Sequence, residues 1–295
     1  MPPVPGQRLP AAQNRTAAAA RALRQAVFAV SVLCDLDIVP ANLGLTLPGR
    51  PPVWVTWSEI RAALAGQPAG STHGRHRLAD WLLARRWAAD LSVTALSDRL
   101  RVVGLPVGHC AHPGAGWVRA EVAGGALQLG LGAVELDPVR PDRVVLLPAA
   151  SLIAAGSEGE SGAQRAFLLL ESLGSLAAER ALGDPAAVLR PCGDSDVVTL
   201  LGARTFRAAL AGKTGGLAAV AVPMRRRGWS QLSLIDPAFA PCAAAATVAD
   251  ERGFARPLLV TADAVAMVAD GGRAPALLLR SPAGVGVRRR DVLYR

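Results

Sequence analysis

The 295-residue sequence predicts an α+β fold, with a mainly helical N-terminal part and a mixed C-terminal part that contains a hairpin. Three observations predict this class. Apolar residues recur at helical spacing within the first 90 residues. Short apolar runs broken by Gly and Pro follow between residues 104 and 148 and are typical of strands. After residue 163, an amphipathic helix precedes a strand–helix–strand pattern.

The first 34 residues predict a disordered start and then a helix. Residues 1–13 are rich in Pro and are expected to be disordered. A helix is expected from about Thr16, because apolar residues recur there on one helical face. These residues are Leu23, Val27, Val30 and Cys34.

Residues 40–64 are expected to form a loop, a strand and a second helix. The Pro- and Gly-rich stretch 40–52 predicts the loop, and the residues VWV at 53–55 predict the strand. Thr56 and Glu59 have the spacing of a capping box, in which each side chain accepts a hydrogen bond from the backbone N–H of the other residue. This pair therefore predicts a helix that begins after Thr56 and ends near Leu64.

Two helices with a short connection are predicted at 75–89 and 94–102, and strands are predicted after them at 104–118, 124–132 and 143–148. Residues 88–107, AADLSVTALSDRLRVVGLPV, resemble a winged helix-turn-helix. The resemblance implies that the second helix enters the major groove of DNA and that the following GLPVGHCAHPGAGWVRA is the wing. Arg99, Arg101 and Arg119 would then contact nucleic acid. A helical hairpin with only a packing role is the alternative.

The polar sequence GSEGESG at 156–162 lacks periodicity, which is typical of a linker. It predicts a winged-helix-like domain at 14–155, a linker at 156–163 and an α/β domain at 164–295. A surface loop within one domain is the alternative. The second domain is expected to contain a helix at 164–182, a strand at 196–202, a helix at 203–211, a strand at 217–224 and a hairpin turn at 270–273.

The formal charge of +9 comes almost entirely from arginine, because Lys213 is the only lysine. Basic charge favours anionic partners, so DNA or RNA is the predicted partner. Arg225, Arg226 and Arg227 form a second predicted patch, since guanidinium groups bind phosphates with two parallel N–H donors. Codon bias toward arginine on a solvated surface is the alternative. The leading hypothesis is a nucleic-acid-binding protein with a regulatory role.

The four histidines form two H-x-x-H pairs, His73 with His76 and His109 with His112, and the second pair encloses Cys110. Zinc prefers about four nitrogen or sulfur ligands, so these histidines are the candidate zinc ligands. Neither pair has a C-x-x-C partner, and histidines of exposed turns are the alternative. Cys110 also has histidine neighbours that could act as a base, but no family signature surrounds it.

The residues VSVLCDLDIV at 30–39 resemble the nucleophile loop of haloacid-dehalogenase-type phosphatases. The resemblance implies that Asp35 is the nucleophile, that Asp37 is the acid and base, and that Mg²⁺ screens the phosphate. Thr199 and Lys213 would take the family's next roles. This loop requires a strand where the periodicity predicts a helix, and a helix that ends in an acidic turn is the alternative.

The four cysteines, Cys34, Cys110, Cys192 and Cys242, are scattered and predict reduced thiols in a cytoplasmic protein. An uncharged apolar run of ~18 residues, which a membrane helix needs, is not found in the sequence, so no membrane partner is expected. A third hypothesis is a non-catalytic interaction module that forms a homo-oligomer through an apolar surface.

Overall fold

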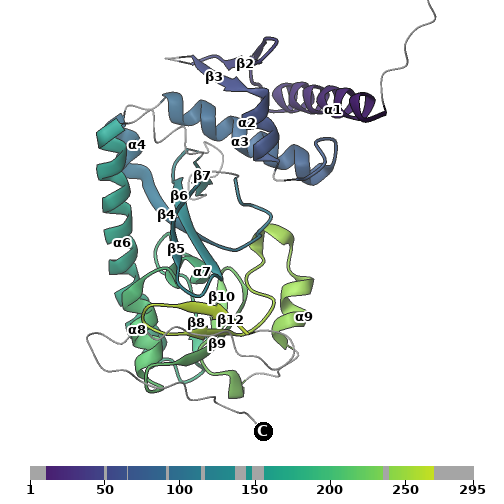
Figure 1. Cartoon of the computed structure of the whole chain (residues 1–295). Coiled ribbons are helices and arrows are strands. Elements are labelled where there is room, and N and C mark those ends of the chain that lie inside the picture. Colours follow the sequence, from purple (N-terminus) through teal and green to yellow (C-terminus); the bar gives the residue numbers. More distant parts are fainter. Residues whose placement is uncertain are drawn as a thin grey trace, which may run out of the picture.

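The computed structural model describes residues 11–49, 52–64, 66–90, 93–113, 117–136, 144–147, 156–234 and 239–268. Within these residues it contains helices and three antiparallel sheets, which confirms the predicted α+β class (Figure 1). The predicted disordered segment lies outside the described residues up to residue 10. Residues 11–13, which were included in that segment, are helical. The predicted turn at 270–273 lies outside the described residues.

The N-terminal elements surround their own hydrophobic cluster. They are α1 (Ala11–Leu33), β1 (Val39–Pro40), β2 (Gly44–Leu47), β3 (Val53–Thr56), α2 (Trp57–Ala63) and α3 (Thr72–Asp90). The strands pair in the order β1-β2-β3, and β2 lies within the stretch 40–52 that was expected to be a loop. The predicted stripe on α1 is confirmed, with Leu23, Val27 and Val30 buried. The capping box is also confirmed at the start of α2.

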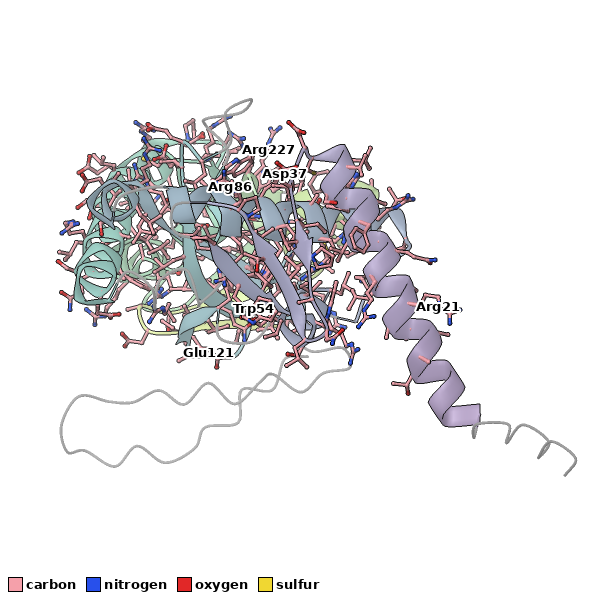
Figure 2. The ribbon with its side chains drawn as sticks, turned by 90° about the horizontal axis from the view of Figure 1, so that it is seen from above. Arg21, Asp37, Trp54, Arg86, Glu121 and Arg227 are labelled. Atoms are coloured by element: carbon pink, nitrogen blue, oxygen red, sulfur yellow. The ribbon has the colours of Figure 1, made fainter. Side chains whose placement is uncertain are left out.

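Helix α1 contains the one described segment, Thr16–Leu33, that is long and apolar enough to cross a membrane. The sequence criterion excluded it because it carries Arg21 and Arg24. Figure 2 shows α1 along one side of the molecule, with Arg21 pointing away from the rest of the chain. A core helix of a soluble protein and a signal sequence pass the same test of length and composition.

The remaining elements form a larger body below α3 (Figure 1). One antiparallel sheet has the order β4-β6-β5, with β7 paired to β6, and a second has the order β12-β11-β9-β10-β8. The strands of the first sheet are β4 (Leu100–Pro106), β5 (Val118–Val122), β6 (Leu127–Ala133) and β7 (Val145–Leu146). Those of the second are β8 (Val188–Leu189), β9 (Ala218–Met224), β10 (Arg227–Trp229), β11 (Leu258–Val260) and β12 (Val265–Met267).

The helices of this body cover both sheets. They are α4 (Val93–Arg99), α6 (Gly156–Gly183), α7 (Val197–Leu200), α8 (Arg204–Gly212), α9 (Phe239–Ala246) and the short 3₁₀ helices η1 (Leu232–Leu234) and η2 (Ala249–Glu251). Figure 1 shows α6 running along one side from α4 to α8. Its contacts with α4, β4 and α8 join the two sheets into one core.

The prediction of a linker at 156–163 is wrong, because these residues form the first turns of α6. Gly162 in this stretch serves close helix packing. A Cβ at Gly162 would lie 2.8 Å from the Oγ of Ser97 on α4. The absence of a side chain at this position lets the two helices approach each other, and a short sequence window cannot distinguish this role from flexibility.

One predicted element has a different type in the structure, and another ends earlier than predicted. The stretch 196–202 was expected to be a strand, but its apolar residues form α7, because a short fully buried run has no periodicity that separates helix from strand. The Asp196 side chain caps this helix by accepting a hydrogen bond from the Thr199 N–H at 2.7 Å. Helix α4 ends at Arg99, so Arg101 lies on β4 and not on the predicted helix.

Candidate metal centre

The structure does not confirm a winged-helix unit around residues 88–120. Helix α4 packs against α6, with Leu96 and Ser97 buried, so this face of the helix is not free to enter a groove. The loop that was expected to be the wing tip contacts the segment 250–252. In this loop, His109 Nε2 bonds the carbonyl of Arg252 at 3.0 Å, and Cys110 Sγ lies 3.5 Å from an oxygen of Asp250.

The arginines predicted to bind nucleic acid come from separate elements, and four of the six pair with carboxylates. The pairs are Arg99–Glu135 at 3.5 Å, Arg101–Asp194 at 2.8 Å, Arg119–Glu160 at 3.6 Å and Arg225–Asp196 at 2.6 Å. Arg226 and Arg227 are exposed, and the guanidinium of Arg227 lies over the ring of Trp229. Much of the predicted phosphate-binding charge is therefore balanced within the chain.

Asp35 and Asp37 follow α1, and both are exposed. The strand that the phosphatase resemblance requires at residues 30–33 is absent, because this segment is the last turn of α1. Figure 2 shows Asp37 near the C-terminal end of that helix. Thr199 is buried in α7, and Lys213 donates a hydrogen bond to the carbonyl of Leu182. The local structure therefore does not support a nucleophile loop here.

Two cavities stand out on the described part of the chain. One of about 570 Å³ lies between β5 and α6 and is lined by Arg119, Phe167 and five further residues. The other, of about 490 Å³, lies where α3 faces β4, β7 and the segments 191–199, 225–226 and 250–251. The second cavity, called the cleft below, is the stronger candidate because it gathers histidine, arginine and carboxylate groups from distant segments.

Three ligand-type side chains meet at the edge of the cleft, which His73 and Asp250 line and to which Cys110 is adjacent in sequence through the lining residue Ala111. One ligand atom each from His73, Cys110 and Asp250 lies within 4.8 Å of the other two. The Nε2 atom of His73 is screened from solvent and has no hydrogen-bond partner among the described residues. Burial and the neighbouring carboxylate of Asp250 raise the pKa of the Cys110 thiol, while the positive charge of Arg77 acts in the opposite direction. This thiol–carboxylate pair is the kind of arrangement that a cation would stabilise.

Each of the three side chains is placed by a different element. Ser71 Oγ accepts a hydrogen bond from the Gly74 N–H at 3.0 Å and thereby starts α3, which carries His73 in its first turn. His73 was expected just before the helix and lies within it. Cys110 belongs to the loop between β4 and β5, and Asp250 belongs to η2.

The other histidines do not belong to this cluster. The Ala111 N–H donates to His109 Nδ1 at 3.1 Å, so Nδ1 is an acceptor and Nε2 carries the proton that it donates to Arg252 O. Burial first, and then the charge of Arg225, lowers the pKa of His109 to about 4, which keeps the ring neutral. Both of its nitrogens are occupied, and it cannot bind a metal without losing a hydrogen bond.

His76 and His112 have other surroundings. His76 is exposed at the rim of the cleft, and the ring of His112 packs edge-on against Trp117 with ring centres 5.1 Å apart. Of the four predicted zinc ligands, the structure therefore brings only His73 into a cluster. Its partners Cys110 and Asp250 were not predicted as ligands. The Cys110 thiol stood between two candidate histidines, but no local signal marked Asp250, which is 140 residues further along the chain.

Comparison with known proteins identifies no relative, because no protein-family model, curated protein or solved structure matches the chain.

Proposed function

We propose that the protein binds a zinc ion on His73, Cys110 and Asp250 and that it is a zinc-dependent enzyme whose substrate enters the cleft. The observation that carries this proposal is the convergence of an imidazole, a thiol and a carboxylate within 4.8 Å, together with the unpartnered and screened Nε2 of His73. Nitrogen, thiolate sulfur and carboxylate oxygen are the zinc ligands of proteins. Magnesium prefers oxygen ligands alone, so this ligand set favours zinc over magnesium.

The separations of the three ligand atoms are close to those of a zinc-bound site. In a tetrahedral zinc site, ligand atoms stand about 3.5 Å apart. All pairs of the three ligand atoms lie within 4.8 Å, so no pair has to close by more than about 1.3 Å to reach that spacing.

The charge of the cleft also favours a cation. Its lining contains five acidic side chains and three arginines. The acidic residues are Asp80, Asp194, Asp196, Asp250 and Glu251, and the arginines are Arg77, Arg225 and Arg226. A divalent ion would balance this excess of negative charge.

Three protein ligands leave one zinc position for water or substrate, which is the arrangement of catalytic zinc sites and not of structural ones. The cleft volume suits a small molecule. We therefore assign the class of zinc-assisted hydrolysis to this site. A cytoplasmic location is part of the proposal, since the four cysteines are free thiols and the site requires Cys110 to stay reduced.

The test is a zinc titration of metal-free protein in competition with a chromophoric chelator. We expect one ion per chain. His73→Ala, Cys110→Ser and Asp250→Asn should each weaken zinc binding by more than about 100-fold, because each removes a direct ligand. With Co²⁺ in place of zinc, a thiolate-to-cobalt charge-transfer band should appear and should be absent in Cys110→Ser.

Two matched controls separate this site from adventitious binding. His76→Ala removes the exposed histidine at the cleft rim, and Cys242→Ser removes an exposed thiol elsewhere. Both variants should keep the affinity of the unmodified protein. Binding that survives Cys110→Ser, or a metal content far below one per chain after loading, would disprove the zinc site.

Nucleic-acid binding and homo-oligomerisation stay predictions from the sequence. Exposed Arg226 and Arg227 are the predicted residues still available to a phosphate backbone. Affinity for DNA or RNA in a gel-shift assay should fall steeply with salt if that function is correct, and a flat salt response would contradict it.

A further inference from the structure

We infer that the cleft binds an oxyanion, a phosphate or carboxylate group of the substrate, on the guanidinium groups of Arg77 and Arg225. This inference rests on the proposed zinc function, because the zinc site identifies the cleft as the place of the chemistry. The observation behind it is independent: Arg77 Nη1 and Arg225 Nε are both screened from solvent and have no hydrogen-bond partner among the described residues. Both arginines line the cleft.

The guanidinium of Arg77 is held in place by its other two nitrogens. Nε donates to the carbonyl of Ala63 at 3.1 Å, and Nη2 donates to the carbonyl of His112. These contacts connect α2, α3 and the loop that carries Cys110, and they leave Nη1 as the unused donor. A donor that is fixed in direction before binding loses little conformational entropy when a ligand arrives.

The guanidinium of Arg225 is held by one ion pair, and the backbone of Arg225 is held by a hydrogen bond. Its Nη2 pairs with Asp196 at 2.6 Å, and its backbone N–H donates to the carbonyl of Glu251 at 2.9 Å. The Nε atom is left without a partner. A buried donor without an acceptor costs about 1–3 kcal/mol, and an oxyanion offers the acceptors that would remove this cost.

No described carboxylate of the cleft accepts a hydrogen bond from Arg77 Nη1 or Arg225 Nε. Asp196 already pairs with Arg225 through Nη2, and Asp194 pairs with Arg101. Asp250 is a proposed zinc ligand. Arg77 lies near enough to Cys110 and Asp250 for their charges to act on it, so an oxyanion on Arg77 would stand beside the zinc. The substrate is therefore a small molecule with a phosphate or carboxylate group next to the bond that reacts.

The experiment measures binding of inorganic phosphate and of acetate by titration calorimetry, with zinc-loaded and with metal-free protein at constant ionic strength. We expect phosphate, acetate or both to bind. The stronger of the two identifies the anionic group of the substrate. Arg77→Gln should weaken that binding at least 10-fold. Arg75→Gln, on the same helix but exposed and outside the cleft lining, is the matched control and should bind as the unmodified protein does.

Arg77→Gln removes two structural hydrogen bonds, so Arg225→Gln is tested in parallel, and far-ultraviolet circular dichroism verifies that each variant is folded. Absence of binding by both anions to the unmodified protein, loaded or metal-free, overturns the inference. Unchanged binding in either folded variant overturns it as well. Arginine-dependent anion binding in a protein that takes up no zinc would support the arginine site while the zinc proposal failed, so the two failures are distinguishable.

Discussion

Gly104 shows how a single residue sets the distance between two elements of the larger body. It lies on β4, and its N–H donates to the Oγ1 of buried Thr199 at 2.9 Å. A Cβ at this position would lie 2.8 Å from Thr199 Cα and 3.0 Å from the carbonyl oxygen of Val198. Since both neighbouring atoms belong to the backbone of α7, no side-chain rotation can relieve the overlap.

We predict that Gly104→Ala destabilises the protein by about 1–3 kcal/mol, because the added methyl group forces β4 and α7 apart. Urea unfolding followed by circular dichroism measures this change. Gly212→Ala is the control, since a Cβ there meets nothing within 4 Å and helix propensity favours alanine. Equal stability of Gly104→Ala and the unmodified protein would contradict the packing described.

At the scale of elements, helix α8 takes its N-terminal cap from another helix. Its own cap residue, Ala203, offers no side-chain acceptor. Glu171 on α6 instead accepts hydrogen bonds from the N–H groups of Arg204 at 2.8 Å and Thr205 at 3.0 Å. A carboxylate at this position also interacts favourably with the positive end of the helix dipole. The interaction therefore couples the position of α8 to that of α6.

The capping role predicts a pH dependence. Burial alone would raise the pKa of Glu171, but the N–H groups of Thr205 and Arg204 stabilise the ionised form, and the pKa is lowered from 4.5. A lowered pKa in the folded state means that the stabilisation is complete above pH 4.5 and is lost as the pH falls through the folded-state value.

Glu171→Gln should cost about 1 kcal/mol at pH 7, because it removes a charged cap. The difference in stability between this variant and the unmodified protein should shrink as the pH falls below 4.5, and thermal unfolding at a series of pH values measures it. Glu179→Gln, an exposed change on the same helix, is the control. A difference that stays constant down to acid pH would show that Glu171 does not act through its charge.

At the scale of the whole molecule, the main hydrophobic cluster crosses the predicted domain boundary. It includes Leu129 and Leu131 from the first sheet, Leu170 from α6, and Val220 and Leu258 from the second sheet. Helix α6 packs against elements from both sides of that boundary, among them β4 and α8. The sheet β4-β6-β5 and helix α4 of segment 14–155 thus share one core with segment 164–295, while the N-terminal elements keep their own cluster.

We predict that segment 164–295 does not fold when it is expressed alone, because it would expose its half of this core to water. Chemical denaturation of this fragment should show no cooperative transition, whereas the full chain should show one. A sharp transition in isolated 164–295 would demonstrate an independent domain and would contradict this view of the core.

How much of the structure could be predicted from the sequence depends on how far apart along the chain the interacting residues stand. The helical face of α1 and the capping box of α2 were predicted correctly, because their residues stand within one or a few turns of each other. The type of α7 and the packing role of Gly162 were missed, because both depend on elements that are far away in the chain. His73 was predicted as a ligand from spacing alone, with the wrong histidine partners.

The sequence by itself determined the α+β class, most helices and the concentration of chemically active side chains around residues 109–112. Only the tertiary structure decided which of these side chains meet. In the folded chain, both nitrogens of His109 form hydrogen bonds, and four of the predicted arginines pair with carboxylates. Asp250 lies close to Cys110 and His73. The physical reason is that hydrogen bonds, ion pairs and metal ligation act over a few ångströms in space, whereas periodicity and capping act between neighbours in the chain.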